Sequence, residues 1–471
     1  MHDFIGLLLS LLRRGLTLAV PVVLFAAVIL AVSWLVCRKK GKSFSWKKAV
    51  CWLMLLGWLV ITVFVTFLMR DETGMAREWN LHPFLAWKQA WNEFSLQGWL
   101  NVFLNIALFV PLGVLLPLLF QQFHKWYWML AAGFGGTLTI ELLQFLTGRG
   151  MCDVDDLFTN TLGAMLGWAA VMLILALVLR DAGWRKRVWE YLSLPLAFAL
   201  AMAVLFGTYA LKPYGNLPEA PVRTANLKGV QWNVTFTPEE TPSTAQVYEV
   251  GRLDKIAAEA FAAKFAKQMG IEFEDAYYYD DLIIFANHSS GDFLNLNQMD
   301  GTWEYKLGKE WAFDCKLEEL SKEILRPMLE ELGISVPEDA EFTLEEFGEH
   351  GILAIFRTDA AHTGTQILHG NLTCRIYEED GKAVCREIIN ELVAMVPCRE
   401  EAIYTPAQAV ERLQSGHSTY GMGLTEETQI DVTDCALDWT ADTKGFYQPV
   451  YRLTLQLSDG SDYQDFVPAL K

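Results

Sequence analysis

The sequence predicts an all-α polytopic membrane helix bundle of about six spans, followed by an α+β extracytoplasmic region of repeated helix-plus-antiparallel-sheet modules. Three observations predict this division. Residues 1–211 contain long apolar runs and carry 17 Lys and Arg against 11 Asp and Glu, a net charge of +6. Residues 212–471 carry 21 against 45, a net charge of −24. In this second part, helical periodicity is followed by alternating strand patterns more than once.

Apolar segments of the first part reach the roughly 20 residues that a helix needs to cross a bilayer. The expected spans are 15–36, 49–69, 98–120, 126–147, 157–179 and 189–211. Residues 1–14 form a lead-in that contains too short an apolar run to span, and we expect it at the membrane interface. No A-x-A cleavage site follows the first span, so we interpret that span as an anchor rather than a signal peptide.

The basic loops predict the orientation of the spans. Residues 38–48 and 180–187 are the densest basic runs and should be cytoplasmic under the positive-inside rule. The loops 70–97 and 148–156 are then outside. Six spans deliver residues 212–471 to the outside as well. The sequence thus predicts a multi-pass cell-membrane protein whose C-terminal region is extracellular.

A few polar side chains lie inside these apolar spans, where they are costly and mark candidate functional sites. Asn105 lies about seven residues, roughly 10 Å, below the outer end of its span. Glu141 lies at a similar depth in the next span, and Gln144 shares its helix face at i+3. Asn160 is in the first turn of the fifth span. The spacing predicts that these groups converge at one level in the outer leaflet.

Small residues in the same spans predict close helix packing. Asn160, Gly163 and Gly167 share one face, and Gly163-x-x-x-Gly167 is a pattern that lets membrane helices approach closely. Pro111 and Gly113 should kink or loosen the third span near the polar level.

The loop between the fourth and fifth spans adds charged groups to this level. Arg149 can hold a phosphate or carboxylate by bidentate donation. Asp153, Asp155 and Asp156 can hold a divalent cation that bridges to phosphate. Glu141, with Asp153, is the candidate acid–base pair. Each residue alone also has a structural interpretation, because a buried amide often bonds a neighbouring helix and Arg149 with Asp153 can staple the loop.

This combined pattern resembles the VanZ-like membrane proteins, a family named for a glycopeptide (teicoplanin) resistance determinant. The resemblance covers roughly residues 15–180. It implies a role at a bacterial cell envelope, and it supplies no catalytic mechanism. The residues that carry it are Asn105-x-x-x-Phe109-x-Pro111-Leu112-Gly113, Glu141-x-x-Gln144, Arg149, Asp153-x-Asp155-Asp156, Asn160-Thr161-x-Gly163, Gly167 and the upstream Asn80-Leu81-His82-Pro83-Phe84.

The second part divides by its turn signals into a linker, 212–220, and α+β modules over 221–310, 311–400 and 401–471. The last module resembles PepSY-like and YycI-like extracytoplasmic domains of Gram-positive bacteria. That resemblance implies binding or regulation rather than catalysis. The residues that carry it are Thr405-Pro406-Ala407-Gln408-Ala409, Leu413, Gln448-Pro449-Val450-Tyr451-Arg452 and Phe466-Val467-Pro468-Ala469-Leu470.

Six cysteines should lie outside, which allows 15 pairings. Cys374 and Cys385 flank an EEDG turn, so a cross-strand disulfide between them is the first expectation, and Cys398 with Cys435 is the second. The alternative is that the thiols stay unpaired. No CxxC pair or histidine cluster indicates a metal site.

The favoured function is that of a VanZ-like envelope protein that binds an envelope or lipid-linked ligand in the outer-leaflet pocket and confers glycopeptide tolerance. Its partners would be a membrane lipid or lipid-linked precursor and an extracytoplasmic protein for the acidic region. The alternative is a membrane enzyme that acts on a lipid-linked phosphate or peptidoglycan precursor, with Glu141 as acid or base. A transporter is a third option, which lacks a polar path to the inner side. The cofactor is unknown, with a divalent cation as the one candidate, and nothing indicates nucleic acid.

Overall fold

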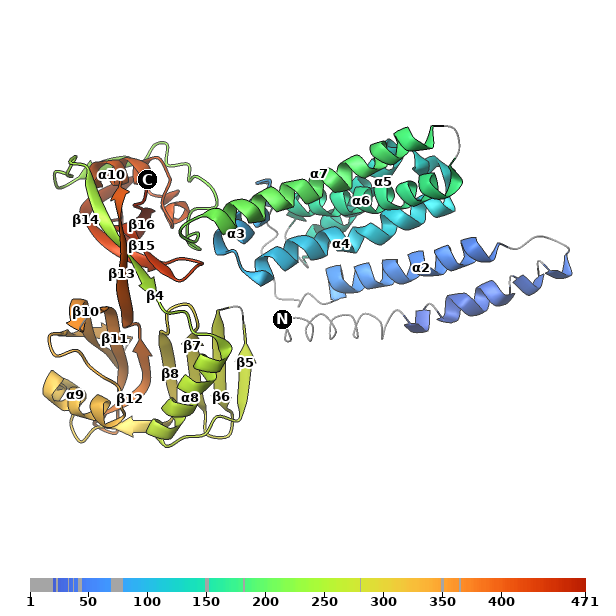
Figure 1. Cartoon of the computed structure of the whole chain (residues 1–471). Helices are drawn as coiled ribbons and strands as arrows, with labels where there is room; N and C mark the ends of the chain where they lie inside the picture. The colour runs from blue at the N-terminus through green and yellow to red at the C-terminus, as the bar shows by residue number, and fades with distance from the viewer. Residues whose placement is uncertain are drawn as a thin grey trace. The chain divides into compact units, whose positions relative to one another are not determined.

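The computed structural model describes residues 20–22, 24–32, 34–36, 38–40, 45–68, 79–148, 152–180, 183–279, 281–348, 351–363 and 366–471. The chain forms two compact units, one over residues 1–91 and 95–212 and the other over 92–94 and 213–471. The first is helical and the second is rich in β-sheet (Figure 1). The expected lead-in over residues 1–14 lies outside the described residues, and so does Cys37.

Five helices of the described residues are long and apolar enough to cross a membrane. An additional apolar helix, Val20–Val36, is shorter, and the expected span 15–36 lies partly outside the described residues. The five are α2 (Trp46–Val63) with its continuation η1 (Phe64–Leu68), α4 (Leu96–Leu119), α5 (Trp126–Thr147), α6 (Val154–Leu179) and α7 (Trp184–Leu211).

Local signals set the ends of these helices. Ser95 caps α4 by accepting the Gly98 N–H at 2.9 Å. α5 ends at Gly148, whose positive φ of 66° terminates the helix. Asp153 caps the start of α6. The other elements of this unit are β1 (Trp79–Asn80), α3 (Leu85–Glu93), η2 (Gln121–His124) and β2 (Cys152–Asp153).

The core of the helical unit lies between α4, α5 and α6. Phe109, Met129 and Ala164 are fully buried at its centre. Indole N–H groups tie neighbouring segments to it, because Trp58 of α2 donates to the Leu108 carbonyl at 2.6 Å and Trp168 of α6 donates to the Phe123 carbonyl at 2.8 Å. Pro111 lies inside α4, which continues through it to Leu119.

Glycines let α4 and α6 pack backbone against backbone. A methyl group on Gly163 would lie 1.9 Å from the carbonyl oxygen of Ile106, and one on Gly167 would lie 2.2 Å from that of Val110. In the opposite direction, a methyl group on Gly113 of α4 would lie 2.0 Å from the carbonyl oxygen of Ala164. Only glycine fits at these three positions.

The second unit is built on one 14-stranded sheet with the path β3-β14-β15-β4-β13-β11-β12-β8-β7-β6-β5, from which β9, β10 and β16 branch. Its helices are α8 (Lys255–Met269), α9 (Lys322–Glu331) and α10 (Pro406–Gln414), with short turns η3 (Leu317–Glu319) and η4 (Gly421–Leu424). Its strands are β3 (Gln231–Val234), β4 (Ser243–Val250), β5 (Asp275–Tyr278), β6 (Leu282–Asn287), β7 (Asp292–Asn297), β8 (Trp303–Ala312), β9 (Glu341–Phe347), β10 (Gly351–Thr363), β11 (Gln366–Glu379), β12 (Lys382–Asn390), β13 (Val393–Ile403), β14 (Gln429–Ala441), β15 (Phe446–Gln456) and β16 (Asp462–Pro468).

The two largest hydrophobic cores among the described residues of this unit lie on this sheet. α8 and α9 contribute to one core, with Phe265 and Leu325 among its buried side chains, and α10 contributes to the other, with Leu413. β4 and β13 pair with each other between the cores (Figure 1). The expected modules 221–310 and 311–400 thus share one core, because β8 runs across residue 310 and pairs with β12.

The structure does not form the disulfide expected between Cys374 and Cys385, and every cysteine that it describes, Cys398 and Cys435 included, is a free thiol. A bulge in the pairing of β11 with β12 explains why the two cysteines do not lie directly opposite each other. Cys374 lies opposite Ile388 and Cys385 lies opposite Ile376, so the two cysteines are diagonal neighbours. Both are buried, and the hydrogen bond between the two thiols, followed by burial, raises the pKa of Cys374.

Candidate functional site

The predicted polar residues gather where the end of α5 meets the start of α6. The short strands β1 and β2 pair in parallel there, with Asn80 opposite Asp153. The Asn80 amide donates to the Asp153 carboxylate at 3.0 Å, and that carboxylate also accepts the Asp155 N–H at 2.8 Å. Glu141 of α5 accepts the backbone N–H of Asp153 at 2.9 Å. Glu141 is only 1% exposed, so a carboxyl group lies fully inside the helical unit.

Asp155 anchors the segment that precedes α3. Its carboxylate accepts the backbone N–H groups of Phe84 and Ala86, the latter at 2.7 Å. Phe84 has a positive φ of 63° and its ring stacks on Phe158 with centroids 5.3 Å apart. This aspartate therefore fixes the N-L-x-P-F element against α6.

A second chain of contacts connects α4, α5 and α6. Asn105 donates to the Asp156 carboxylate at 2.6 Å. The Thr137 hydroxyl donates to the backbone carbonyl of Asp156 at 3.3 Å and accepts the Asn160 amide N–H at 3.0 Å. The structure thus brings Asn105, Asp156 and Asn160 together, with Thr137 as the link.

Gln144 connects α5 to η1, the π-helical turn that continues α2. Its amide donates to the Thr66 carbonyl at 2.9 Å. Thr66 lies in η1, a π-helical turn, and its hydroxyl donates to the Thr62 carbonyl at 2.8 Å. π-Helical turns occur frequently at functional sites because they distort the regular hydrogen-bond ladder.

One stripe of α5 organises the whole arrangement. Thr137, Glu141 and Gln144 follow the i, i+4, i+7 spacing of a single helix face, and all are buried. The stripe is about 10 Å long at 1.5 Å per residue. Three buried polar groups in a row on an otherwise apolar helix form the centre of the candidate site.

The aspartates do not converge as ligands of one cation. The carboxylates of Asp153, Asp155 and Asp156 each accept hydrogen bonds from different donors. Within the part of the chain that the structure describes, no group of three or more His, Cys, Asp or Glu residues is placed to hold a metal ion. Arg149, the expected anion-binding residue, lies outside the described residues.

Four members of this site have no site role in the sequence prediction: Thr137, Asn80, Cys152 and the Thr66 carbonyl. Thr137 could have been found from its i−4 spacing to Glu141. Asn80 was considered only as part of a loop motif. Cys152 is buried next to Asp153, and burial first, then the Glu141 and Asp153 charges, raises the pKa of its thiol. No sequence pattern signalled the Thr66 carbonyl, because a backbone acceptor has no signature.

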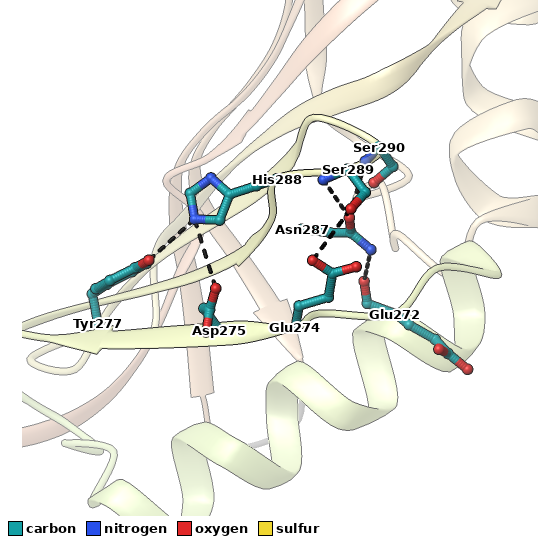
Figure 2. A network of polar contacts seen from close by, with 8 residues as sticks. All are labelled: Glu272, Glu274, Asp275, Tyr277, Asn287, His288, Ser289 and Ser290. Carbon is teal, nitrogen blue, oxygen red and sulfur yellow. Dashed lines mark hydrogen bonds and ion pairs between the residues drawn. The ribbon is translucent and has the colours of Figure 1, made fainter.

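The sheet-rich unit holds a second polar cluster at the β5–β6 edge (Figure 2). His288 lies 3.1 Å from the Tyr277 hydroxyl and 3.8 Å from the Asp275 carboxylate, with its side chain 54% exposed. Asn287 accepts the N–H groups of Ser289 and Ser290, which fixes the turn into β7. An exposed ion pair such as His288 with Asp275 contributes little to stability. The main role of the cluster is therefore to hold the turn between β6 and β7.

Residues 50–176 match the VanZ/LLP1 family model. These residues form a VanZ-like domain. "Protein VanZ" of Enterococcus faecium is 28% identical over 130 residues, which cover 27% of this chain and 73% of that protein. A solved structure of an uncharacterised protein from Eubacterium rectale is 13% identical, covers 50% of this chain and 86% of that chain, and has a TM-score of 0.27, at which the similarity says nothing about the fold.

The VanZ-like domain contains the entire polar site. Every contact described above for the helical unit, from Thr62 in α2 to Asn160 in α6, lies within the matched residues. The packing glycines Gly113, Gly163 and Gly167 lie within them as well.

Proposed function

We propose that the VanZ-like domain binds an envelope or lipid-linked ligand at the polar site and thereby confers tolerance to glycopeptides such as teicoplanin. One observation carries this proposal: Glu141 is buried in the α5 stripe and accepts the Asp153 N–H, beside the hydrogen bonds that link α4, α5 and α6. Burying a carboxyl group in an apolar bundle is costly. A purely structural role would be served by a neutral amide.

In this proposal the residues have distinct tasks. Asn105, Asp155, Asp156 and the amide nitrogen of Asn160 hold the helices and the loop over the site through the contacts given above. Gln144 and Glu141 face the ligand from α5. Arg149, as expected from the sequence, binds an anionic group of the ligand.

A membrane enzyme with Glu141 and Asp153 as acid and base is the second candidate. The buried carboxyl group of Glu141 favours it. Cys152 lies next to this pair, but its raised pKa keeps the thiol protonated and therefore a poor nucleophile. The site thus supports ligand binding better than nucleophilic catalysis.

The sheet-rich unit is the accessory part of this proposal. With the orientation predicted by the basic loops, it lies outside the cell, where its acidic residues would face a protein partner. Its resemblance to PepSY-like and YycI-like domains supports binding or regulation.

Teicoplanin susceptibility of a sensitive Gram-positive host tests the proposal. The full-length chain should raise the minimal inhibitory concentration, and Glu141→Gln should abolish that increase at unchanged protein level. The variant keeps an oxygen that can accept the Asp153 N–H, so it removes the ionisable group without removing the contact.

The matched control is Glu190→Gln, which changes an exposed glutamate of α7 and should leave tolerance intact. Full tolerance in Glu141→Gln would refute the proposal. Loss of the folded protein in this variant would instead assign Glu141 a structural role.

A further inference from the structure

Among the described residues, two amide oxygens at the polar site have no hydrogen-bond donor. They are Oε1 of Gln144 and Oδ1 of Asn160, which belong to side chains only 1% and 5% exposed. In both residues the amide nitrogen is already used, by the Thr66 carbonyl and by the Thr137 hydroxyl.

These contacts fix which way each amide points. Turning the Gln144 amide over would place its oxygen against the Thr66 carbonyl, so that two acceptors would face each other. The Thr137 hydroxyl donates to the Asp156 carbonyl and therefore accepts from the Asn160 nitrogen. The two oxygens are thus the acceptors left over after the internal bonds are made.

An acceptor buried in an apolar helix bundle requires a donor, because no bulk water reaches it there. The two amides lie at the two ends of the α5 stripe, since Asn160 of α6 bonds Thr137 and Gln144 lies about two turns further along α5. Glu141, whose carboxylate oxygens are also acceptors, lies between them. A deprotonated phosphate or carboxylate offers only hydrogen-bond acceptors, so it cannot bond these two oxygens. An N–H or O–H group of a ligand can donate a hydrogen bond to each of them.

We infer that Gln144 and Asn160 recognise neutral hydrogen-bond donors of the ligand, the N–H and O–H groups of its peptide or sugar part. This inference rests on the proposed function and specifies which part of the ligand enters the site.

Binding to the full-length chain in lipid nanodiscs tests the inference. The probes are a long-chain N-acyl dipeptide amide and its analogue with N-methylated backbone amides, which keeps the carbonyls and loses the donors. The wild-type protein should bind the first about tenfold more tightly than the second, as expected for the loss of about one hydrogen bond. Gln144→Met and Asn160→Leu should each remove most of that preference.

Two variants separate recognition from internal structure. Thr139→Val alters an exposed residue of α5 and should leave the preference unchanged. Thr62→Val removes a buried hydroxyl of α2 that also has no partner among the described residues and is therefore an internal candidate for the missing donor. It should leave the preference unchanged as well.

Equal binding of the two probes, absence of binding by either, or an effect of Thr62→Val as large as that of Gln144→Met would overturn the inference. Such a result together with lost tolerance in Glu141→Gln would leave the proposed function standing. Unchanged tolerance in Glu141→Gln would refute the proposed function itself. Thermal unfolding of each variant separates a recognition defect from a folding defect.

Discussion

Both units of this protein bury polar side chains, but they satisfy them differently. In the sheet-rich unit, Asp442 is 0% exposed and accepts four donors, the N–H groups of Gly215, Lys444 and Phe446 and the amide of Gln448. In the VanZ-like domain, Gln144 is equally buried, but its oxygen has no donor.

This difference distinguishes polar residues that are buried to hold the fold together from polar residues that are buried to bind a ligand. Asp442 closes a loop of hydrogen bonds that ties the segment after α7 to the β14–β15 turn, so its surroundings explain it completely. Gln144 and Asn160 keep acceptors that nothing in the described protein uses. A buried amide whose own hydrogen bonds leave an oxygen unused therefore indicates a ligand.

The largest expected effect concerns the packing that encloses the polar site. Gly163→Ala would place a methyl group against the Ile106 carbonyl and force α4 and α6 apart. We expect a loss of about 3 kcal/mol or more of stability, because neither backbone can yield without moving a whole helix. Gly135→Ala, where nothing lies within 4 Å, should be close to neutral. Thermal unfolding in detergent would check both, and equal stability of the two variants would contradict the packing described.

The next largest effect tests whether Asp442 of the sheet-rich unit has a purely structural role. Asp442→Ala leaves the donors of Gly215, Lys444 and Gln448 without their acceptor, and we expect a loss of about 3 kcal/mol in the sheet-rich unit. Hydrogen exchange of the full-length chain should then rise at residues 213–216 and 442–448. Glycopeptide tolerance should respond less than it does to Glu141→Gln. Asp459→Ala, in an exposed turn, serves as the control and should leave exchange at these residues unchanged.

Much of the helical unit could be predicted because its membrane helices are long apolar segments, in which polar residues are rare and easily recognised. Asn105, Glu141 and Asn160 stand out against apolar neighbours in the sequence. In the structure Asn105 donates to Asp156, Asn160 donates to Thr137 and Glu141 accepts the Asp153 N–H. Thr137 is hard to recognise from the sequence because threonine is common in membrane helices, where its hydroxyl often donates to a backbone carbonyl of the same helix. The role of the Thr66 carbonyl depends on a π-helical turn, which no side-chain pattern encodes.

The sheet-rich unit was harder to predict because its contacts are long-range. Local periodicity predicted helices and strands in this region, and the structure shows a sheet-rich unit with helices. The pairing of β8 with β12, which places α8 and α9 on one core, depends on strands about 80 residues apart. The bulge that sets Cys374 and Cys385 on a diagonal likewise cannot be found in a turn sequence.

The smallest effect concerns an ion-pair cluster that joins the two cores of the sheet-rich unit. Asp438 of β14 lies 3.4 Å from His369 of β11 and 3.2 Å from Arg452 of β15. Burial alone would raise the pKa of Asp438, but the hydrogen bond from His369, the Trp439 N–H and the two positive charges together lower it. A carboxyl group whose folded-state pKa is lowered stabilises the fold above its ordinary pKa of about 3.9, and this contribution disappears as the pH falls through the folded-state value.

Asp438→Asn should therefore reduce stability by about 1 kcal/mol or less at neutral pH and have no effect at a pH well below 4. Urea unfolding of the full-length chain, followed by hydrogen exchange in β11 and β14 at neutral and acidic pH, would measure the difference. Asp434→Asn changes an exposed carboxylate on the same strand and should show no such pH dependence. A loss of the same size at both pH values would mean that the Asp438 charge does not couple the two cores, and their connection would then depend on the β4–β13 pairing and apolar contacts alone.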